Sequence, residues 1–347
     1  MTLYSLADKV IEAPVVTSFT RIGYDLRRLM GDWRDPGTYR MAGRVVAITG
    51  PTSGLGLAAA EVLTAVGASV ILIARDERKA SELRARLATE TGNEEISVLI
   101  CDMADMDAVR AAARTIDAEY DRLDVLIHNA GSLLKERRTA PGGVELTTAV
   151  QVVGPFLMTG LLLDKLAATP YARVLTMSSG GMYTAGLTVS KLQMDPESYR
   201  GAEQYARAKR AQVTLNEMWA ERTAGSGIRF HALHPGWADT PGVAESLPRF
   251  RMLLGPLLRS PAQGADTLVW LAADDGIPLA SSGGFWLDRR PRSIHRLRST
   301  RRTDTPQRRS ELWNWVSHAA DWELPRPGDA ESPFILEIRA TAIRYSK

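Results

Sequence analysis

Tyr205 and Lys209 are the pair of residues best suited to chemistry, because they stand four positions apart in Tyr205-Ala-Arg-Ala-Lys209. On a helix, side chains four apart lie on one face. A nearby ammonium stabilises a phenolate, and lowering the phenol pKa by about 2–3 units would bring it into the acid–base range. The same lysine can hold a ribose. Helices also contain such pairs by chance, so their surroundings decide the interpretation.

Two serines follow the apolar run 173–177, which predicts a buried strand. Open α/β sheets place their chemistry at the carboxyl ends of strands, where Ser178 and Ser179 would lie. Ser179 can hydrogen-bond a substrate oxygen. With Tyr205 and Lys209 it would form a site that moves a proton while a cofactor moves a hydride.

A glycine-rich turn, Gly50-x3-Gly54-x-Gly56, lies between the apolar run 45–48 and a helical pattern that begins near Ala58. A strand, a glycine turn and a helix in this order begin a nucleotide-binding unit, in which the helix N-terminus offers N–H groups to phosphates. The spacing differs from the usual G-x-G-x-x-G. An ordinary strand–helix turn is the alternative.

Arg75 follows the apolar run 69–74, at the position next to the adenosine ribose in a doubly wound sheet. An acidic residue there would bind the ribose hydroxyls of NAD. A guanidinium instead pairs with a 2′-phosphate, so we favour NADP(H) and leave NAD(H) open. The alternative is an exposed arginine that begins the next helix.

Two further strand ends carry candidate cofactor contacts. Asp102 follows the run 96–101, and its carboxylate can accept from an adenine amino group; alternatively it caps the next helix, a role for which Asp105 competes. Asn129-Ala130-Gly131 follows the run 124–128, and its small residues would let a cofactor pass close to the backbone. We expect His128 to be structural.

The composition excludes several protein classes. The chain has 347 residues, of which 45% are hydrophobic and 24% charged, and its single cysteine, Cys101, excludes an internal disulfide. No apolar run is long enough to span a membrane, and no signal-peptide pattern begins the chain. The net charge of +3 is too small to imply a polyanionic partner. We therefore expect a soluble, cytoplasmic protein that does not bind nucleic acid.

Apolar runs at 228–233 and 284–288 complete a set of seven predicted strands that alternate with helices, which indicates an α/β fold. Helices are expected at 146–168, 205–222 and 262–273. The polar segment 182–203 is predicted to be a loop or small insertion. The segment 237–262, rich in proline and glycine, is predicted to be a mobile cap.

The two ends of the chain lie outside this pattern. In residues 1–39, apolar residues recur at helical spacing among arginines, which predicts a helical arm packed on the domain or on a second subunit. Attachment to a membrane surface is the alternative. Residues 289–347 form an arginine-rich extension. We favour a solvated loop over an anionic partner for its first part, where nine arginines fall within 21 residues: 289, 290, 292, 296, 298, 301, 302, 308 and 309.

The order of these motifs resembles that of the short-chain dehydrogenase/reductase family over about residues 40–288. The motifs are Thr49-Gly50-x3-Gly54-Leu55-Gly56, Asn129-Ala130-Gly131, Ser179, Tyr205-x3-Lys209 and Pro235-Gly236-x3-Thr240. The long Ser179–Tyr205 spacing and Ala74-Arg75-Asp76 resemble the retinol-dehydrogenase-like branch. The resemblance implies a Rossmann-like doubly wound sheet of about seven parallel strands in three layers.

The resemblance also implies residue roles. Ser179 would orient a carbonyl, Tyr205 would act as acid and base, and Lys209 would lower the Tyr205 pKa and bind ribose. Gln151 stands where the family often has an asparagine that helps to hold a proton-relay water. The residues implied to bind the cofactor are Gly50, Thr52, Ser53, Gly54, Leu55, Gly56, Arg75, Asp102, Met103, Asn129, Ala130, Gly131, Tyr205, Lys209, Pro235, Gly236, Trp237 and Thr240.

These observations together predict an NADP-preferring oxidoreductase that interconverts an alcohol and a ketone or aldehyde. Trp237 and the cap residues Leu247, Phe250, Met252, Leu253 and Leu254 indicate a small apolar substrate, unless they pack against the core. A cofactor-binding regulatory or scaffold protein with little turnover is one alternative. A module that binds membrane surfaces is another alternative. The sequence also allows a homo-oligomer.

Overall fold

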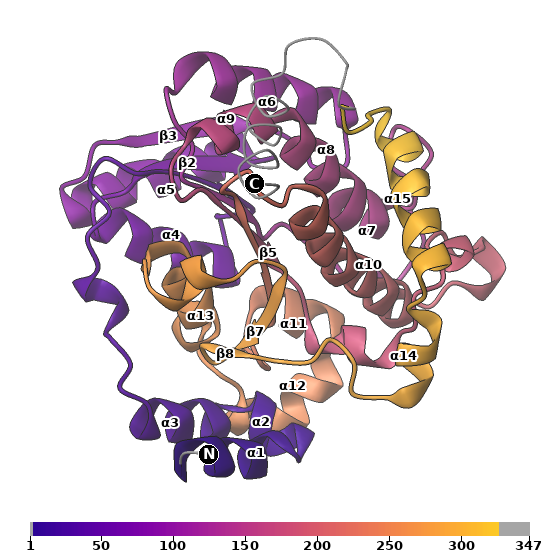
Figure 1. Ribbon diagram of the computed structural model, residues 1–347. Helices are drawn as coiled ribbons and strands as arrows, with labels where there is room; N and C mark the ends of the chain where they lie inside the picture. Colours follow the sequence, from indigo (N-terminus) through magenta and orange to yellow (C-terminus); the bar gives the residue numbers. More distant parts are fainter. Residues whose placement is uncertain (1–2, 326–347) are drawn as a thin grey trace, which may run out of the picture.

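The fold is built on one eight-stranded sheet in the order β3-β2-β1-β4-β5-β6-β7-β8 (Figure 1). The computed structural model describes residues 3–325. The first seven strands are parallel, as predicted, and β8 adds an antiparallel edge that was not. The strands are β1 Val45–Thr49, β2 Ser69–Ala74, β3 Ile96–Ile100, β4 Val125–His128, β5 Arg173–Met177, β6 Arg229–Leu233, β7 Gly284–Leu287 and β8 Arg290–Pro291.

The centre of the sheet lies between β1 and β4, where Val46 pairs with Val70 on one side and Val125 on the other. Strands buried on both faces need continuous apolar runs, which is why these segments could be recognised. The strand order reverses between β1 and β4, and doubly wound sheets bind their ligands at the carboxyl ends of the strands at such a reversal.

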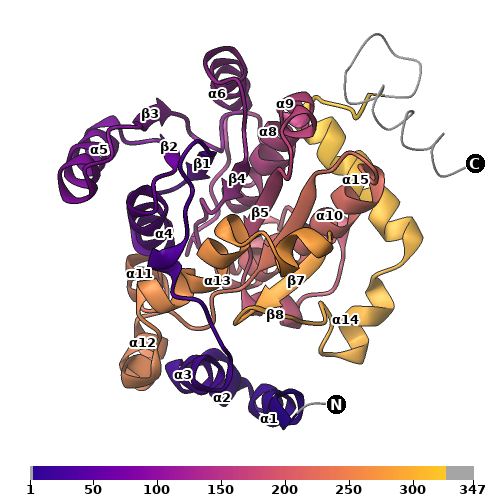
Figure 2. The same ribbon diagram turned by 60° about the vertical axis from the view of Figure 1, so that its left-hand side comes forward.

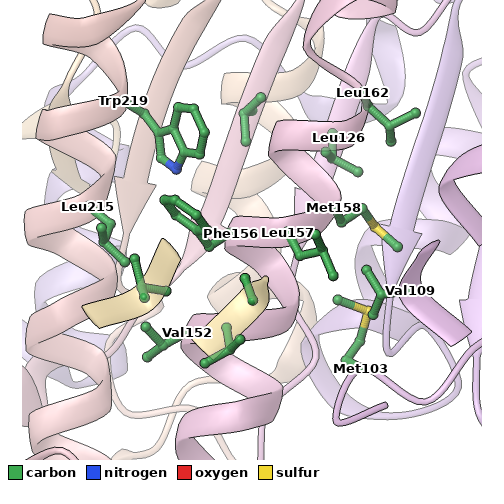
Figure 3. Close-up of a cluster of buried hydrophobic side chains, with 14 of the residues drawn as sticks. Met103, Val109, Leu126, Val152, Phe156, Leu157, Met158, Leu162, Leu215 and Trp219 are labelled. Carbon is green, nitrogen blue, oxygen red and sulfur yellow. The ribbon is translucent and has the colours of Figure 1, made fainter. Parts of the chain in front are cut away.

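Helices cover both faces of the sheet and give the predicted three layers (Figure 2). One core cluster joins the sheet to α4 Gly54–Ala65, α5 Glu77–Thr91 and α13 Pro261–Ala273. The other joins it to α6 Met106–Glu119, α8 Gly154–Leu161, α10 Gly201–Arg222 and α15 Pro306–Ala320. Figure 3 shows part of the second cluster, in which Phe156 packs against Trp219.

The prediction of one continuous helix over 146–168 is wrong. The segment divides into α7 Leu146–Thr148, a π-helical stretch Ala149–Val153, α8, and α9 Leu163–Ala168. Pro155 explains the break, because it has no N–H to donate to the carbonyl of Gln151 four residues earlier. Gln151 consequently lies in the widened π-helical turn.

Short helices lie in the segment predicted to be a loop or small insertion and in the segment predicted to be a cap. The segment before α10 contains the 3₁₀ turns η3 Gly180–Thr184, η4 Val189–Lys191 and η5 Pro196–Ser198, and α10 begins four residues earlier than predicted. The cap contains α11 Pro241–Ser246, α12 Pro248–Leu254 and η6 Gly255–Leu257. Two further 3₁₀ turns are η1 Pro36–Thr38 and η7 Ile277–Ala280.

The N-terminal arm forms three helices that lie side by side next to α12, as both ribbon views show (Figures 1 and 2). They are α1 Leu3–Glu12, α2 Val15–Phe19 and α3 Arg21–Met30. The extension forms α14 Arg298–Thr303 and α15, and Leu312, Trp313 and Val316 of α15 are buried in the second core cluster. Within residues 3–325, no helix has the length and hydropathy needed to cross a bilayer.

The prediction that the arginines after residue 288 form a solvated loop is wrong for several of them. Arg289 makes a buried bidentate ion pair with Asp266, Arg292 pairs with Asp8, and Arg309 pairs with Asp304 and Glu217. Arg298, Arg301 and Arg302 are exposed. The compensating acids are far away in sequence, so the run of arginines alone could not reveal them. Residues 326–347 lie outside the described residues.

Candidate active site

The glycine turn after β1 forms a tight cradle. Gly50 has φ +65°, and a Cβ on Gly56 would lie 2.2 Å from the Gly50 carbonyl oxygen, so Gly56 must lack a side chain. Thr52 and Ser53 lie in the turn, and the Ser53 side chain does not cap α4. The first-turn N–H groups of α4 therefore remain available to a phosphate, as the sequence predicts.

Asn129 holds the ends of β1 and β4 together beside this cradle. Its amide donates to the Thr49 and Gly50 carbonyl oxygens at 3.0 Å each. The Thr49 hydroxyl in turn accepts from the backbone N–H groups of Asn129 and Ala130 at 3.0 Å. These bonds use both amide hydrogens of Asn129, so this residue shapes the carboxyl edge of β1 and β4.

Arg75 and Asp102 lie where β2 and β3 end. Arg75 is exposed, and Asp76 after it accepts from the Lys79 N–H to cap α5. Asp102 accepts from the Ala104 N–H at 2.9 Å, whereas Asp105 caps α6. The capping alternative for Asp102 is therefore wrong.

Other predicted cofactor residues pack around the cradle. Met103 is buried, with its carbonyl oxygen against Gly154. Leu55 packs beneath Gly264 of α13, and Gly131 lies against Gln151.

Ser179, Tyr205 and Lys209 come together at the carboxyl end of β5. Ser179 and Tyr205 share a hydrogen bond between their hydroxyls. The Lys209 ammonium lies 5.4 Å from the centre of the Tyr205 ring and donates to the Met177 carbonyl oxygen at 2.8 Å. Ser178 is buried, and its hydroxyl donates to the Lys209 carbonyl oxygen, so it is Ser179 that faces Tyr205.

The pKa shifts in this group differ from the sequence-based expectation. Burial raises the pKa of Tyr205, and the hydrogen bond with Ser179 only partly opposes this. Burial also lowers the pKa of Lys209 to about 7. Burial is the larger of these two influences on the Tyr205 pKa, and Lys209 is not among the groups that lower it. The phenol therefore keeps its proton at neutral pH.

Gln151 is buried beside this group on the π-helical stretch. Its amide nitrogen donates to the Ser132 carbonyl oxygen at 2.7 Å, and its Oε1 has no hydrogen-bond partner. The widened turn therefore directs the amide oxygen toward the interior rather than into a protein contact.

The segment after β6 approaches the cradle from the other side. Gly236 has φ +74°, and its N–H donates to His234 Nδ1 at 3.0 Å. Thr240 caps α11 through the Val243 N–H, and a Cβ on Gly54 would lie 3.3 Å from the Thr240 side chain. Pro235, Trp237 and Thr240 are half-buried. Two motifs almost 190 residues apart in sequence therefore meet.

Three residues outside the predicted site support it from behind. The Phe19 carbonyl oxygen accepts from the Trp237 N–H at 2.7 Å, and the Phe19 ring lies against Gly180. The Arg259 guanidinium lies against Gly236 and pairs with Asp288. The sequence spacing of Phe19, Arg259 and Asp288 did not indicate that they lie beside the site. These residues belong to the arm, the cap and the end of β7, which meet only in the folded chain.

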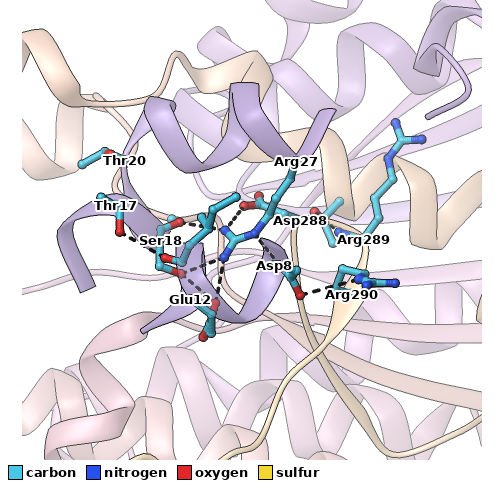
Figure 4. A network of polar contacts seen from close by, with 12 residues as sticks. Asp8, Glu12, Thr17, Ser18, Thr20, Arg27, Asp288, Arg289 and Arg290 are labelled. Atoms are coloured by element: carbon cyan, nitrogen blue, oxygen red, sulfur yellow. Dashed lines mark hydrogen bonds and ion pairs between the residues drawn. The ribbon is translucent and has the colours of Figure 1, made fainter. Parts of the chain in front are cut away.

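A buried ionic network anchors the arm at this point (Figure 4). Arg27 donates to Asp288 at 2.7 Å, to Asp8 at 2.8 Å and to Glu12 at 2.9 Å. Although burial opposes it, Arg292 and Arg27 lower the pKa of Asp8 to about 2. The carboxylate of Asp8 therefore stays ionised throughout the physiological range.

The cradle and the helix end fit a nicotinamide dinucleotide. The glycines allow the backbone of this turn to pack closely against its neighbours, and the N-terminus of α4, which the Ser53 side chain does not cap, suits a diphosphate. Lys209 would hold the ribose, and Thr240 would contact the nicotinamide amide. The bound group would supply or accept a hydride.

Comparison with known proteins agrees with this geometry. A family model described as short chain dehydrogenase matches residues 44–249. Human dehydrogenase/reductase SDR family member 12 is 38% identical over 256 residues, covering 74% of this chain and 80% of that protein. Human retinol dehydrogenase 11 is 30% identical over 262 residues, covering 75% of this chain and 82% of that protein.

Solved structures share the fold. An uncharacterized protein from Mycobacterium paratuberculosis is 24% identical, with a TM-score of 0.67, over 84% of this chain and 99% of that chain. A short chain dehydrogenase from Escherichia coli complexed with NADPH is 23% identical, with a TM-score of 0.60, over 74% of this chain and 100% of that chain.

Proposed function

Because the chain belongs to the short-chain dehydrogenase/reductase family, of NAD(P)-dependent oxidoreductases, we propose that it interconverts an apolar alcohol and its carbonyl compound with NADP(H). The observation that carries this proposal is the grouping of Ser179, Tyr205 and Lys209 at the carboxyl edge of β5, next to the cradle.

The three side chains divide the work of reduction. Ser179 and Tyr205 donate hydrogen bonds to the carbonyl oxygen, and Tyr205 transfers its proton to that oxygen as negative charge develops there. The protonated state of the buried phenol supports this role. Lys209 lies close enough to stabilise the phenolate that remains. In the oxidation direction Tyr205 accepts the alcohol proton.

The NADP preference rests on Arg75. Its side chain is exposed directly after β2, and Asp76, the nearest carboxylate in sequence, caps α5. A guanidinium at this position can donate two hydrogen bonds to a 2′-phosphate. Ala74 before it has no group that would select the ribose hydroxyls of NAD.

The apolar substrate rests on the cap. Met252 and Leu253 of α12 are each 75% exposed, so they do not pack against the core. Phe250 packs edge-on against Trp237, 5.1 Å between ring centres, beside the Pro235–Gly236 turn. The cap therefore presents apolar surface next to the position proposed for the nicotinamide.

Peripheral contact with a lipid surface is a further part of the proposal. Eight apolar side chains of the arm are exposed, and Lys9, Arg21 and Arg28 are exposed on the same three helices. Helices with an apolar face and basic residues bind at membrane interfaces. The arm lies beside α12, so an apolar substrate could pass from lipid to the cap (Figure 2). The apolar residues are Leu6, Val10, Val15, Val16, Ile22, Leu26, Leu29 and Met30.

Oxidation of NADPH across aliphatic aldehydes, retinoids, steroids and quinones tests the proposed activity. We expect turnover with at least one of these classes, and a loss of about 100- to 10,000-fold in kcat for Tyr205→Phe, because the proton donor is removed. NADPH binding should persist in that variant. Tyr171→Phe is the control, since Tyr171 is an exposed phenol.

Comparable turnover by Tyr205→Phe would contradict the role of Tyr205. NADPH binding without turnover on any class would instead favour the cofactor-binding regulatory alternative.

A further inference from the structure

A small internal cavity lies between α8, α10 and the sheet, behind the catalytic group. Its volume is about 30 Å³, measured as space open to the centre of a water molecule. Val152, Phe156, Leu215 and Trp219 form part of its wall (Figure 3). A cavity of this size holds at least one water if its wall offers enough polar groups.

The polar side chains in the wall have atoms without partners. Among the described residues, eleven buried side-chain nitrogen and oxygen atoms make no hydrogen bond, and five of them belong to residues lining this cavity. They are His128 Nδ1, Gln151 Oε1, Gln212 Nε2, Gln212 Oε1 and Asn216 Oδ1. Native proteins rarely leave such atoms unpaired, and a cluster of them around one space indicates shared water partners.

The chemistry of these groups suits water. Gln212 offers a donor and an acceptor, whereas Gln151 Oε1 and Asn216 Oδ1 are acceptors. Burial lowers the pKa of His128 to about 3, so the ring is neutral, and its Nε2 already pairs with the Thr159 hydroxyl at 2.8 Å. Water can donate to the acceptors and accept from Gln212 at once.

The cavity is connected to the catalytic group through α10. Tyr205, Lys209, Gln212 and Asn216 recur at spacings of four, three and four residues, which places them on one face of the helix. The N-terminal part of this face carries the proposed acid–base pair, Tyr205 and Lys209. Gln212 and Asn216, further along the helix, line the cavity. Gln151 meets the same cavity from the π-helical stretch.

We propose that this cavity holds ordered water that joins Gln151 to Gln212 and Asn216, and that Gln212 is thereby a positioning residue for Tyr205 and Lys209. The water fixes the distance between the π-helical stretch and α10, and so the direction of the catalytic face toward the substrate. The positioning role rests on the proposed function, whereas the hydration of the cavity does not.

A high-resolution crystal structure of the wild-type protein tests hydration directly. Density for water within hydrogen-bond distance of Gln151 Oε1 and the Gln212 amide would support the proposal. A dry cavity would overturn it. This measurement stays decisive even if no substrate is ever found.

Gln212→Met tests the positioning role, because it keeps the side-chain length and removes both polar atoms. We expect kcat to fall about tenfold while the NADPH KM stays within about twofold, since a small misplacement slows chemistry more than binding. The melting temperature should fall, because the water loses partners. A raised melting temperature with unchanged kcat would overturn the proposal.

Leu215→Met is the matched control. It alters the same wall with nearly conserved volume and leaves every polar atom in place. We expect its kcat to equal that of the wild type, and an equal loss in both variants would overturn the specific role of Gln212.

Discussion

At the residue scale, the two buried members of the catalytic group have opposite shifts with one cause. Desolvation disfavours both the phenolate of Tyr205 and the ammonium of Lys209. The Tyr205 phenol is therefore protonated at neutral pH, which is the form that can donate a hydrogen bond to a carbonyl oxygen.

This leads to a prediction about pH. Because the pKa of Lys209 is lowered to about 7, its charged form is lost as pH rises through that value, and kcat/KM for reduction should fall above it. In Lys209→Arg the falling limb should move to higher pH, because a guanidinium keeps its proton. Steady-state rates between pH 5 and about 10 measure the falling limb of the wild type and that of Lys209→Arg. An unchanged limb in Lys209→Arg would assign it to another group.

Arg75 is the residue on which the cofactor preference depends. Arg75→Ala should weaken NADPH binding about 10- to 100-fold and NADH binding much less, because only NADPH has the 2′-phosphate. Fluorescence titration with both cofactors measures this difference. The control is Arg78→Ala, which removes an exposed arginine paired with Glu82. Equal loss for both cofactors would refute the phosphate contact.

At the element scale, the break in the helical segment 146–168 decides where Gln151 lies. The apolar pattern over 146–168 is helical throughout, and only Pro155 signals the widened turn that carries Gln151. π-helical turns often occur at functional sites. The seven parallel strands were predictable because each central strand is a continuous apolar run.

The anchoring of the arm gives a prediction at this scale. Asp288→Ala would leave Arg27 and Arg259 buried without their shared carboxylate, and we expect a loss of about 3–5 kcal/mol in the free energy of unfolding. NADPH affinity should fall too, because Arg259 lies against Gly236. Denaturant unfolding and cofactor titration measure the two effects.

The control for this prediction is a similar ion pair at the surface. Asp239 pairs with Arg251 in the cap, and both side chains are substantially exposed. Asp239→Ala should cost less than about 1 kcal/mol. If the two substitutions cost the same, the network does not anchor the arm.

At the scale of the whole molecule, the N-terminal arm packs against the segment after β7, and α15 packs into the core. Asp8 pairs with Arg292 across 284 positions, and α15 enters the core through Leu312 and Trp313. The segments outside the matched family region, residues 44–249, thereby complete the wall behind the active site. They also include the exposed apolar residues of the arm.

The exposed apolar residues of the arm give a prediction about vesicles. The double variant Leu26→Glu/Leu29→Glu should bind vesicles of phosphatidylcholine and phosphatidylserine at least about tenfold more weakly, because two apolar side chains would no longer enter the lipid. Co-sedimentation measures the bound fraction. Ile277→Glu is the control, since Ile277 is an exposed apolar residue outside the arm. No difference between these variants would remove the membrane proposal.

The sequence by itself determined the sheet and the composition of the catalytic group. Strand runs and the motifs at Gly50, Ser179 and Tyr205 are local patterns, and local geometry turns them into strands, a cradle and a shared helix face. The periodic patterns that predict helices and strands could not place Phe19 behind Gly180 or pair Arg27 with Asp288.

Those contacts were decided by the tertiary structure alone. Burial and charge compensation act between residues that are distant in sequence and leave no trace in local spacing. The same is true of the pKa values of Tyr205 and Lys209, which depend on how completely the folded chain excludes water from them. The sequence therefore predicts which groups react, whereas the fold sets the protonation of those groups and the contacts that support them.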